Sequence, residues 1–338
     1  MKIIVVGGAG YIGSVICRRL KKDGHYIKVI DRDIFITDEI VYDELISQDI
    51  RDLQPEVFVG SDIVFDYSGI SNDPSGDINS DLTYSINLDG RRNVAHCAKV
   101  AGVKRYVFAS TCSVYGSVES KFGVDETYAT KPLTVYSKSA VEMEKVLIDL
   151  SNKNFKVLSI RHGTVYGFSP KMRLDLVVNL MCKSAILTKK IFLTGGGQQR
   201  RPLVSLNTIA TFASLLAERL EGFISNDNYD VVNLAEGNVK INSLSESLKK
   251  ILDSHLNSDI EICLVPDDED KRDYAVNTKK LNNFFNYVPK TLSESDVTEL
   301  VDGLKSIDMN DPRFVTQKWY RYLLMIEDAL GKSGKLRR

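Results

Sequence analysis

The sequence lacks several features that mark particular classes of protein. Its five cysteines are scattered over 338 residues without a C-x-x-C pair, so neither a disulfide framework nor a zinc site is indicated, and we expect no metal ion. No uninterrupted apolar run approaches the roughly 18 residues of a membrane span. Neither sign of charge dominates, because 44 Lys and Arg oppose 45 Asp and Glu for a net charge of −1. This balance does not suggest nucleic acid or an anionic membrane as a partner.

The composition is that of a folded protein, with 43% apolar and 26% charged residues, and the length suits about two domains. The first apolar run, at residues 3–6, follows one lysine and meets glycines rather than a small-residue cleavage site. It therefore predicts a first strand and not a signal peptide, and we expect a cytoplasmic protein.

Short β-branched runs alternate with longer amphipathic stretches in the first half of the chain. The predicted strands are residues 3–6, 27–30, 63–67, 106–109 and 157–160, and the predicted helices are residues 12–22, 84–101 and 135–150. Strands separated by helices of this length predict βαβ units and a parallel sheet that is buried on both faces.

The alternation weakens after about Arg161. Helices are predicted at residues 174–187, 206–220, from Ser243 onward and at 316–330, with strands at 191–193, 231–234 and 260–265. We expect an α/β protein whose doubly wound parallel sheet lies in residues 1–165, with later segments able to return to it. A smaller α/β lobe is expected over residues 166–338.

A glycine-rich turn follows the first predicted strand and opens the first helix. Gly7, Gly10 and Gly13 have the spacing G-x-x-G-x-x-G, which suits a tight turn, a close approach of the backbone to a pyrophosphate and close packing of helix on strand. The helix N-terminus would then bind the diphosphate of a dinucleotide. Asp31 closes the second predicted strand, where a carboxylate binds the adenosine ribose hydroxyls and repels a 2′-phosphate. This predicts NAD rather than NADP, although Arg32 could weaken the preference.

Several segments along the chain occur in a characteristic order: residues 7–13, 48–52 (QDIRD), 87–90 (NLDG), 102–110 (GVKRYVFAS), 113–116 (SVYG) and 136–139 (YSKS). Together they resemble the extended short-chain dehydrogenase/reductase family, in its nucleotide-sugar epimerase and dehydratase branch, over nearly the whole chain. The resemblance implies a Rossmann-type sheet with a substrate-binding C-terminal lobe, NAD as cofactor and a nucleoside-diphosphate sugar as substrate. It implies cofactor contacts by Gly7, Gly10, Tyr11, Ile12, Gly13, Asp31, Arg32, Asp49, Ile50, Tyr67, Ser68, Gly69, Asn87, Tyr136 and Gly163.

The resemblance also implies the reacting groups. In the family a tyrosine is the general base or acid, and a Ser or Thr hydroxyl helps to hold the reacting oxygen. A lysine four residues after the tyrosine binds the nicotinamide ribose and helps to lower the pKa of the tyrosine. By position the hydroxyl is Thr111 and the tyrosine is Tyr136, but the lysine position holds Ala140. Lys138 points roughly to the other side of the helix, so it cannot simply replace that lysine.

Ala140 leaves three interpretations open. The chain is an inactivated variant, a natural member with another route for the proton or slow turnover, or a protein that binds NAD and sugar without chemistry. Cys112 and Ser113 follow Thr111 where 4,6-dehydratases of the family generally carry acidic residues, so dehydration is disfavoured. The leading function is NAD-dependent epimerisation at C4 of the sugar, followed by a C4 dehydrogenase or keto-sugar reductase, and then by a catalytically silent binding protein.

Residues of the second half would hold the sugar nucleotide, if the resemblance extends to them. Arg201 and Arg272 match arginines that bind phosphate, for which a forked guanidinium is suited. Asn179 matches an asparagine that holds the diphosphate. Thr164 stands where many epimerases carry a substrate-binding asparagine, and Thr111 would also contact the substrate.

Two further expectations concern His162 and the oligomeric state. His162 fits a core position and a substrate contact equally well. The predicted helices at residues 84–101 and 135–150 correspond to those that form a four-helix interface in relatives, and two-fold pairing is the commonest oligomer geometry. We therefore expect a homodimer.

Overall fold

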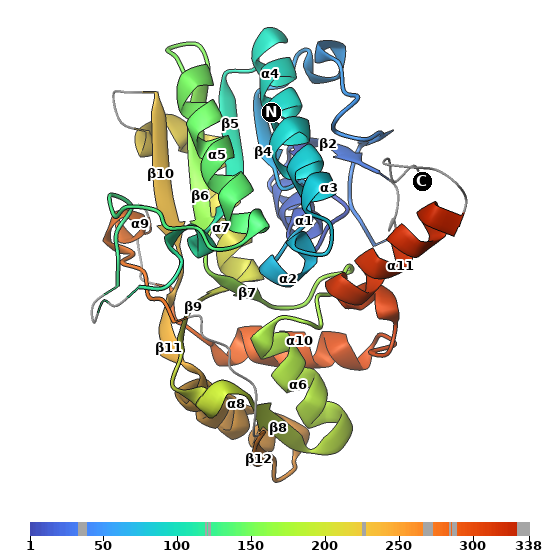
Figure 1. Cartoon of the computed structure of the whole chain (residues 1–338), viewed down its shortest axis with the longest axis vertical. Helices are drawn as coiled ribbons and strands as arrows, with labels where there is room; N and C mark the ends of the chain where they lie inside the picture. The colour runs from blue at the N-terminus through green and yellow to red at the C-terminus, as the bar shows by residue number, and fades with distance from the viewer. Residues whose placement is uncertain are drawn as a thin grey trace.

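Seven parallel strands form the main sheet, in the order β10-β6-β5-β4-β1-β2-β3 (Figure 1). The computed structural model describes residues 1–32, 39–118, 120, 123–224, 228–265, 273–283, 285 and 289–329. The strands are β1 (Lys2–Val6), β2 (Tyr26–Asp31), β3 (Glu44–Ser47), β4 (Ile63–Asp66), β5 (Arg105–Thr111), β6 (Lys156–His162) and β10 (Tyr229–Leu234). This order, which reverses direction between β1 and β4, is that of the Rossmann fold and confirms the predicted fold class.

Helices cover both faces of this sheet, as the apolar strands require. In β1, Ile3 and Val5 point into one core and Ile4 and Val6 into the other. The helices α1 (Gly13–Lys22) and α7 (Leu206–Arg219) cover the first face, and α4 (Arg91–Val100) and α5 (Val135–Leu150) cover the second (Figure 1).

The second half of the chain forms a smaller lobe below the sheet in Figure 1. Its strands β7 (Thr164–Tyr166), β9 (Arg200–Ser205) and β11 (Gly237–Lys240) form one small sheet, and β8 (Lys190–Leu193) pairs with β12 (Glu261–Leu264) in another. Its helices are α6 (Val177–Thr188), α8 (Ile241–Leu256), α9 (Lys279–Asn282), α10 (Glu294–Lys305) and α11 (Thr316–Ala329). The elements α7 and β10 follow residue 165 in the chain but belong to the main sheet and its cover. The domain boundary at residue 165 therefore stays a prediction.

Several predicted elements differ from the observed ones. The predicted helix over 84–101 consists of the end of α3 (Ser80–Tyr84), a π-helical turn (Ser85–Gly90) and α4. The helix predicted from residue 174 begins at Val177, because Leu176 before it has an extended backbone with a ψ of 140°. The backbone N–H of Leu174 donates to the carbonyl of Phe314 at 2.7 Å. The strands β3, β7, β9 and β11 were not predicted, since strands of three to six residues are too short for a clear periodicity. The helix α10 was not predicted either.

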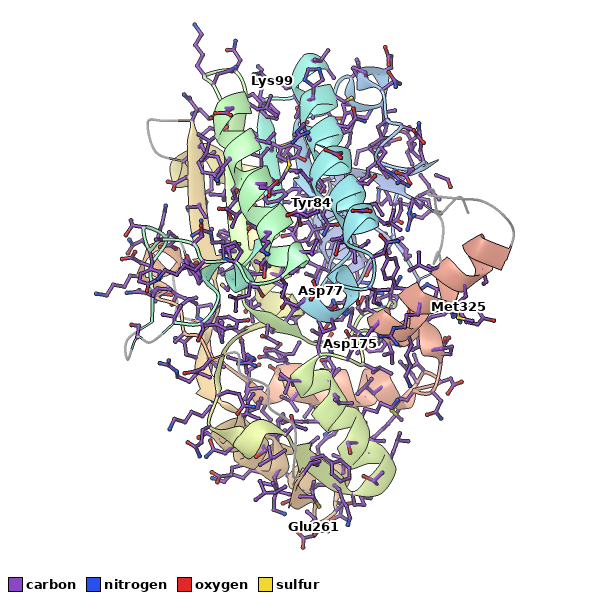
Figure 2. The ribbon with its side chains drawn as sticks, in the orientation of Figure 1. Asp77, Tyr84, Lys99, Asp175, Glu261 and Met325 are labelled. Atoms are coloured by element: carbon purple, nitrogen blue, oxygen red, sulfur yellow. The ribbon has the colours of Figure 1, made fainter. Side chains whose placement is uncertain are left out.

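Short helical turns complete the fold at α2 (Asp73–Gly76), Pro55–Phe58, Cys112–Tyr115, Gly195–Gly197, Leu220–Phe223 and Pro312–Phe314. Asp175 lies where the sheet half meets the smaller lobe (Figure 2). It accepts hydrogen bonds from Asn72, which caps α2, at 2.7 Å and from Thr316, which begins α11, at 3.5 Å. Among the described residues, no helix has the length and apolarity to cross a membrane.

Candidate active site

A pocket of about 830 Å³ opens at the carboxyl ends of the main strands, where open α/β sheets bind their ligands. Segments that follow β1, β2, β4, β5 and β6 form one side, and residues of α6, β9 and α11 form the other. The pocket is lined by most of the predicted site residues: Gly7, Gly10, Tyr11, Ile12, Gly13, Asp31, Arg32, Asp49, Ile50, Tyr67, Ser68, Gly69, Thr111, Tyr136, Gly163, Thr164 and Arg201. Residues far apart in the sequence are therefore brought to one place.

The glycine turn is built by close backbone contacts. Gly7 has a φ of +75°, which is the left-handed conformation that favours glycine. A Cβ on Gly13 would lie 2.2 Å from the carbonyl oxygen of Gly7, so only glycine lets α1 begin this close to the turn. Residues 10–13, at the N-terminus of α1, line the pocket, and a helix N-terminus favours a bound diphosphate. These features fit the NAD pyrophosphate.

Asp31 ends β2 at the edge of the same pocket. Its carboxylate accepts backbone hydrogen bonds from Ala9 at 3.0 Å and from Arg32 at 2.7 Å. Burial raises the pKa of Asp31, and these N–H groups and the nearby Lys171 oppose the rise. Lys171 also lines the pocket, and burial lowers its pKa. The adenosine end thus combines the expected carboxylate with a lysine that the sequence did not reveal, because Lys171 lies in a segment without periodicity.

Tyr136 lies in the first turn of α5, which begins with a reciprocal cap. Thr134 accepts from the backbone N–H of Ser137 at 3.2 Å, and Ser137 accepts from that of Thr134 at 3.1 Å. Thr111 ends β5 and lines the same pocket as Tyr136. Burial, and then the negative charge of Asp73, raise the pKa of Tyr136, while the hydroxyl of Thr111 opposes them. The tyrosine and hydroxyl predicted to react thus lie in one pocket, with the phenol protonated at neutral pH.

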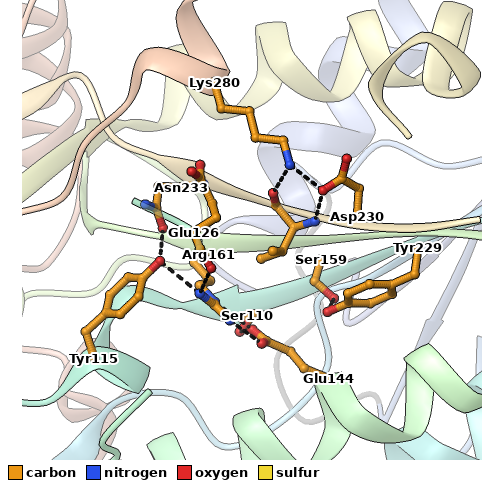
Figure 3. A network of polar contacts seen from close by, with 11 residues as sticks. Ser110, Tyr115, Glu126, Glu144, Ser159, Arg161, Tyr229, Asp230, Asn233 and Lys280 are labelled. Atoms are coloured by element: carbon orange, nitrogen blue, oxygen red, sulfur yellow. Dashed lines mark hydrogen bonds and ion pairs between the residues drawn. The ribbon is translucent and has the colours of Figure 1, made fainter. Parts of the chain in front are cut away.

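A buried ion pair fixes the position of α5 against the sheet (Figure 3). Glu144, two turns after Tyr136, accepts from Arg161 of β6 at 2.7 and 3.0 Å and from Ser110 of β5 at 2.6 Å. Arg161 also donates to the hydroxyl of Tyr115 at 2.9 Å. Removing one partner of such a pair leaves an uncompensated buried charge, which costs about 3–5 kcal/mol. The helix that carries the tyrosine is therefore rigidly held.

Ala140 lies one turn after Tyr136 and does not line the pocket. Its side chain is 6% exposed and belongs to an apolar cluster with Cys112, Tyr115 and Val276. Lys138 is exposed and also does not line the pocket, in agreement with the expectation that it does not replace the family lysine. The cations that act on Tyr136 are instead buried arginines of the pocket wall, Arg91 and Arg173, whose effect on its pKa is smaller than that of burial.

Two predicted contact residues lie outside the pocket lining. The side chain of Asn87 accepts from the backbone N–H of Ile70 at 2.8 Å and donates to its carbonyl at 2.9 Å, so it holds the loop after β4. Asn179 has no exposed surface; it donates to the hydroxyl of Tyr11 at 2.9 Å and accepts from the N–H of Gly167 at 3.1 Å. The expectation that Asn179 holds a diphosphate is therefore corrected, because its amide is occupied inside the protein. Arg272 lies outside the described residues.

The other substrate candidates do line the pocket. The guanidinium of Arg201 lies 5.6 Å from the ring centre of Tyr274, which orients it by a cation–π contact. His162 is buried, and its Nε2 lies 3.3 Å from the hydroxyl oxygen of Tyr67. Burial lowers the pKa of His162 to about 4. It is therefore a neutral histidine that belongs both to the core and to the pocket wall.

The sequence did not reveal three further parts of the site. Asp73 lines the pocket beside Tyr136, and Arg173 lines it while it pairs with Asp175 at 2.7 Å. The C-terminal helix α11 was predicted as a helix without a role, yet it contributes Thr316, Trp319, Tyr320 and Leu323 to the pocket wall. None of these lies in a motif, so only their positions in space identify them.

Comparison with known proteins agrees with this geometry. A model of the NAD dependent epimerase/dehydratase family matches residues 3–235. An uncharacterized UDP-glucose epimerase, YtcB, of Bacillus subtilis (strain 168) is 29% identical over 221 residues, which are 60% of this chain and 67% of that protein. The sterol-4-alpha-carboxylate 3-dehydrogenase, decarboxylating, of Bos taurus is 28% identical over 223 residues, 64% of this chain. The chain spans only 60% of the length of the bovine relative.

Solved structures share the fold at low identity. The UDP-N-acetylglucosamine 4-epimerase from Methanobrevibacter ruminantium M1, in complex with UDP-N-acetylmuramic acid, has a TM-score of 0.78 at 21% identity, over 90% of this chain and 98% of that one. The UDP-glucose 4-epimerase of Thermotoga maritima with UDP-glucose has a TM-score of 0.78 at 21% identity, over 90% and 99% of the two chains.

The family match covers more than half of the chain and includes β1 with its glycine turn, Asp31, Thr111 and Tyr136. It agrees with the cofactor that the glycine turn and Asp31 predict, which is NAD. The chain belongs to the NAD-dependent epimerase/dehydratase family.

Proposed function

We propose that this protein is an enzyme that transfers hydride between C4 of a nucleoside-diphosphate sugar and NAD, with 4-epimerisation as the net reaction. The observation that carries the proposal is that Thr111 and Tyr136 line the same pocket as the glycine turn and Asp31. This arrangement supports a proton acceptor beside a dinucleotide site. Hydride transfer from a carbinol needs both, because the hydroxyl proton and the hydride leave together.

Each residue has a defined task in this mechanism. As the phenolate, Tyr136 accepts the proton of the C4 hydroxyl, and Thr111 donates a hydrogen bond to the same sugar oxygen as it becomes a carbonyl. NAD, which the glycine turn and Asp31 would hold, would supply the hydride acceptor for C4 and, once reduced, the hydride donor. Return to the opposite face of the sugar gives the epimer, and Tyr136 then gives back its proton. Because the pKa of Tyr136 is raised by burial, we expect proton removal to limit the rate near neutral pH.

The other side of the pocket suits a nucleotide diphosphate. Arg201 lines it in an orientation fixed by Tyr274, and a guanidinium there can bind phosphate oxygens in a fork. Thr164 begins β7, which pairs with β9, the strand that carries Arg201, and Thr164 also lines the pocket. Two solved neighbours are complexes with UDP-glucose, which makes UDP-sugars the first substrates to test.

The test is turnover by the purified chain with UDP-glucose, UDP-N-acetylglucosamine and dTDP-glucose. We expect a transient rise in the absorbance of reduced nicotinamide and an epimerised sugar in the product, both absent from Tyr136→Phe. A ketone that accumulates with reduced cofactor would identify a C4 dehydrogenase instead. Absence of reduction with every sugar, in this chain and in Ala140→Lys, would contradict the proposal and favour a binding protein.

We also propose a homodimer formed by α3, α4 and α5. The hydroxyl of Tyr84 in α3 donates to Glu142 of α5 at 3.4 Å, and Lys99 of α4 donates to the end of α5 at 2.7 Å, so these helices form one surface (Figure 2). Ile148 on α5 is 51% exposed on it. Light scattering should give twice the 37.9 kDa of one chain, and Ile148→Asp should give the monomer. A monomeric mass for the unmodified chain at micromolar concentration would contradict the dimer.

A further inference from the structure

A carboxylate lies in the reacting part of the pocket, where the residues around Thr111 in the sequence supply none. Asp73 begins α2 and lines the pocket together with Thr111, Ser113 and Tyr136. It is 38 positions from the nearest of these in the chain, so only the fold brings it there. Its negative charge acts on Tyr136 directly.

The carboxylate of Asp73 is oriented by hydroxyl groups on both of its oxygens. Thr134, which caps α5, donates to Oδ1 at 2.5 Å, and Ser113 donates to Oδ2 at 3.4 Å. The preceding residue, Asn72, has a φ of +79° and donates to Asp175 at 2.7 Å. A non-glycine residue in this conformation is strained by about 1–3 kcal/mol, and such strain is concentrated at functional sites.

The short helix that Asp73 begins, α2, packs tightly against Tyr136. A Cβ on Gly76, in the same turn as Asp73, would lie 3.0 Å from the Cβ of Tyr136, so α2 and the first turn of α5 are in direct contact. The position of Asp73 relative to Tyr136 is therefore set by the backbone on one side and by Thr134 on the other. A carboxylate held in this way is preorganised for a reaction at a sugar carbon next to the one whose hydroxyl Tyr136 serves.

The charge of Asp73 opposes the hydride step. A negative group beside a phenol disfavours the phenolate. The charge of Asp73 is the second-largest cause, after burial, of the raised pKa of Tyr136. Its presence therefore does not assist removal of the hydroxyl proton. It is instead suited to a step that follows oxidation, when the sugar carries a carbonyl and a neighbouring C–H bond has become acidic.

We propose that Asp73 is a catalytic residue that removes a proton from the sugar carbon next to the carbonyl formed by hydride transfer. The inference rests on the proposed function, because the C–H bond is acidic only while the ketone exists. The carboxylate takes the proton and becomes a carboxylic acid, the C–H electron pair forms the carbon–carbon double bond, and the carbonyl oxygen becomes an enolate oxygen. Thr111 and Tyr136 donate hydrogen bonds to that oxygen. Return of a proton from Asp73 restores the ketone.

The chemistry of the substrate follows from this assignment. The sugar must carry a hydrogen on C3 or C5, next to the oxidised C4, and it must be uncharged at that position because Asp73 would repel a carboxylate. In heavy water the proton that returns from Asp73 is exchanged for deuterium. A sugar that passes through the site therefore gains one deuterium on carbon, whereas simple 4-epimerisation adds none.

The experiment follows hydride transfer and exchange in the same sample. The protein, NAD and UDP-glucose, UDP-N-acetylglucosamine or dTDP-glucose are mixed in heavy water at equal protein and sugar concentrations, so that a slow first turnover is visible. Reduced nicotinamide is measured by absorbance, and carbon-bound deuterium by mass spectrometry and NMR of the sugar. The unmodified chain should show both. Asp73→Asn should lower deuterium incorporation at least about 100-fold, in the range of one lost acid–base group, while reduction of NAD persists.

The matched control is Asp77→Asn, which removes an exposed carboxylate from the same segment that accepts from the backbone of Val135 at 3.3 Å. Asp77→Asn should keep both signals. A loss of deuterium in Asp73→Asn alone would then not be explained by a general loosening of the junction between α2 and α5. Deuterium that still enters the sugar in Asp73→Asn, or NAD reduction without deuterium in the unmodified chain, would overturn the role of Asp73 and leave the proposed function standing. Failure of every sugar to reduce NAD would overturn both.

Discussion

The two ends of the pocket are built in different ways. At the glycine turn, backbone groups of Gly7 and Gly13 and the N-terminus of α1 form the pocket wall that we expect to bind the cofactor, and we expect the side chain of Asp31 to add one contact. At the other end, side chains from α2, β5 and α5 meet around Tyr136. The first end keeps the pattern of the family, whereas the second has Ala140 in place of a lysine and Asp73 beside the tyrosine. We therefore expect that the binding of NAD and the proposed chemistry on the sugar can be changed independently.

The largest effect should come from removing the phenol at the reacting end. Tyr136→Phe takes away the proton acceptor, so we expect hydride transfer to fall by about 10²–10⁴-fold. The affinity for NAD should fall less than about tenfold, since only one hydrogen bond is lost. Stopped-flow absorbance gives the first quantity and cofactor titration the second. A parallel loss of both would mean that the two ends are not independent.

The difference between the ends also explains how much the sequence could predict. The glycine spacing, Asp31 and the span of α5 are local properties, and each was predicted and lies where expected. The positions of Asp73 and Lys171 were not predictable in this way, because a four-residue helical turn holds Asp73 and a loop holds Lys171, and neither leaves a periodic pattern in the sequence.

Asn179 shows the converse. Its place in the sequence matches a ligand contact, but its amide is buried and bonded to Tyr11 and Gly167. A match in sequence position therefore predicts which part of the structure a residue occupies, and the hydrogen-bond partners of its side chain decide whether it can bind a ligand. Side-chain partners also matter in the helix expected at residues 84–101. It contains the π-helical turn Ser85–Gly90, in which Asn87 bonds to Ile70 of the loop after β4.

His162 lies between the two ends and should make the stability of the fold depend on pH. Burial lowers its pKa to about 4, below the value of about 6.5 in an unfolded chain. Between these values the unfolded state binds more protons, so the free energy of unfolding decreases as the pH falls. The expected contribution is about 2 kcal/mol between pH 7 and pH 5. Urea unfolding at both pH values, compared with His162→Gln, isolates it; an equal pH dependence in the two proteins would show that His162 is not the cause.

At the glycine end, Asp31→Ala should exchange the preference between cofactors. We expect NAD to bind about 10- to 100-fold more weakly, because hydrogen bonds to a charged carboxylate contribute about 1.5–3 kcal/mol. NADP should bind more tightly than before, since Lys171 and Arg32 remain near that position while the repelling charge is gone. Titration of both cofactors measures the effect. The unmodified chain should bind NAD at least about tenfold more tightly than NADP, and equal affinities there would show that the basic neighbours outweigh Asp31.

The smallest expected change restores the family lysine at the reacting end. In Ala140→Lys the ammonium group would enter from one turn beyond Tyr136 and oppose the effect of burial and of Asp73 on its pKa. Each unit by which the pKa falls is about 1.4 kcal/mol and raises the ionised fraction about tenfold. Activity near neutral pH should increase by that factor, and the rise with pH, which in the unmodified chain should continue well above neutral pH, should begin earlier.

The control for this substitution is Lys138→Ala, which removes an exposed lysine that does not line the pocket and should leave the pH–rate profile unchanged. The affinity of Ala140→Lys for NAD should increase moderately, since the glycine turn and Asp31 already bind the cofactor without it. A profile of the unmodified chain that reaches its plateau below pH 7 would contradict the prediction. In that case the arginines of the pocket wall would lower the pKa of Tyr136 enough for catalysis, and Arg173→Lys would be expected to change the profile where Ala140→Lys does not.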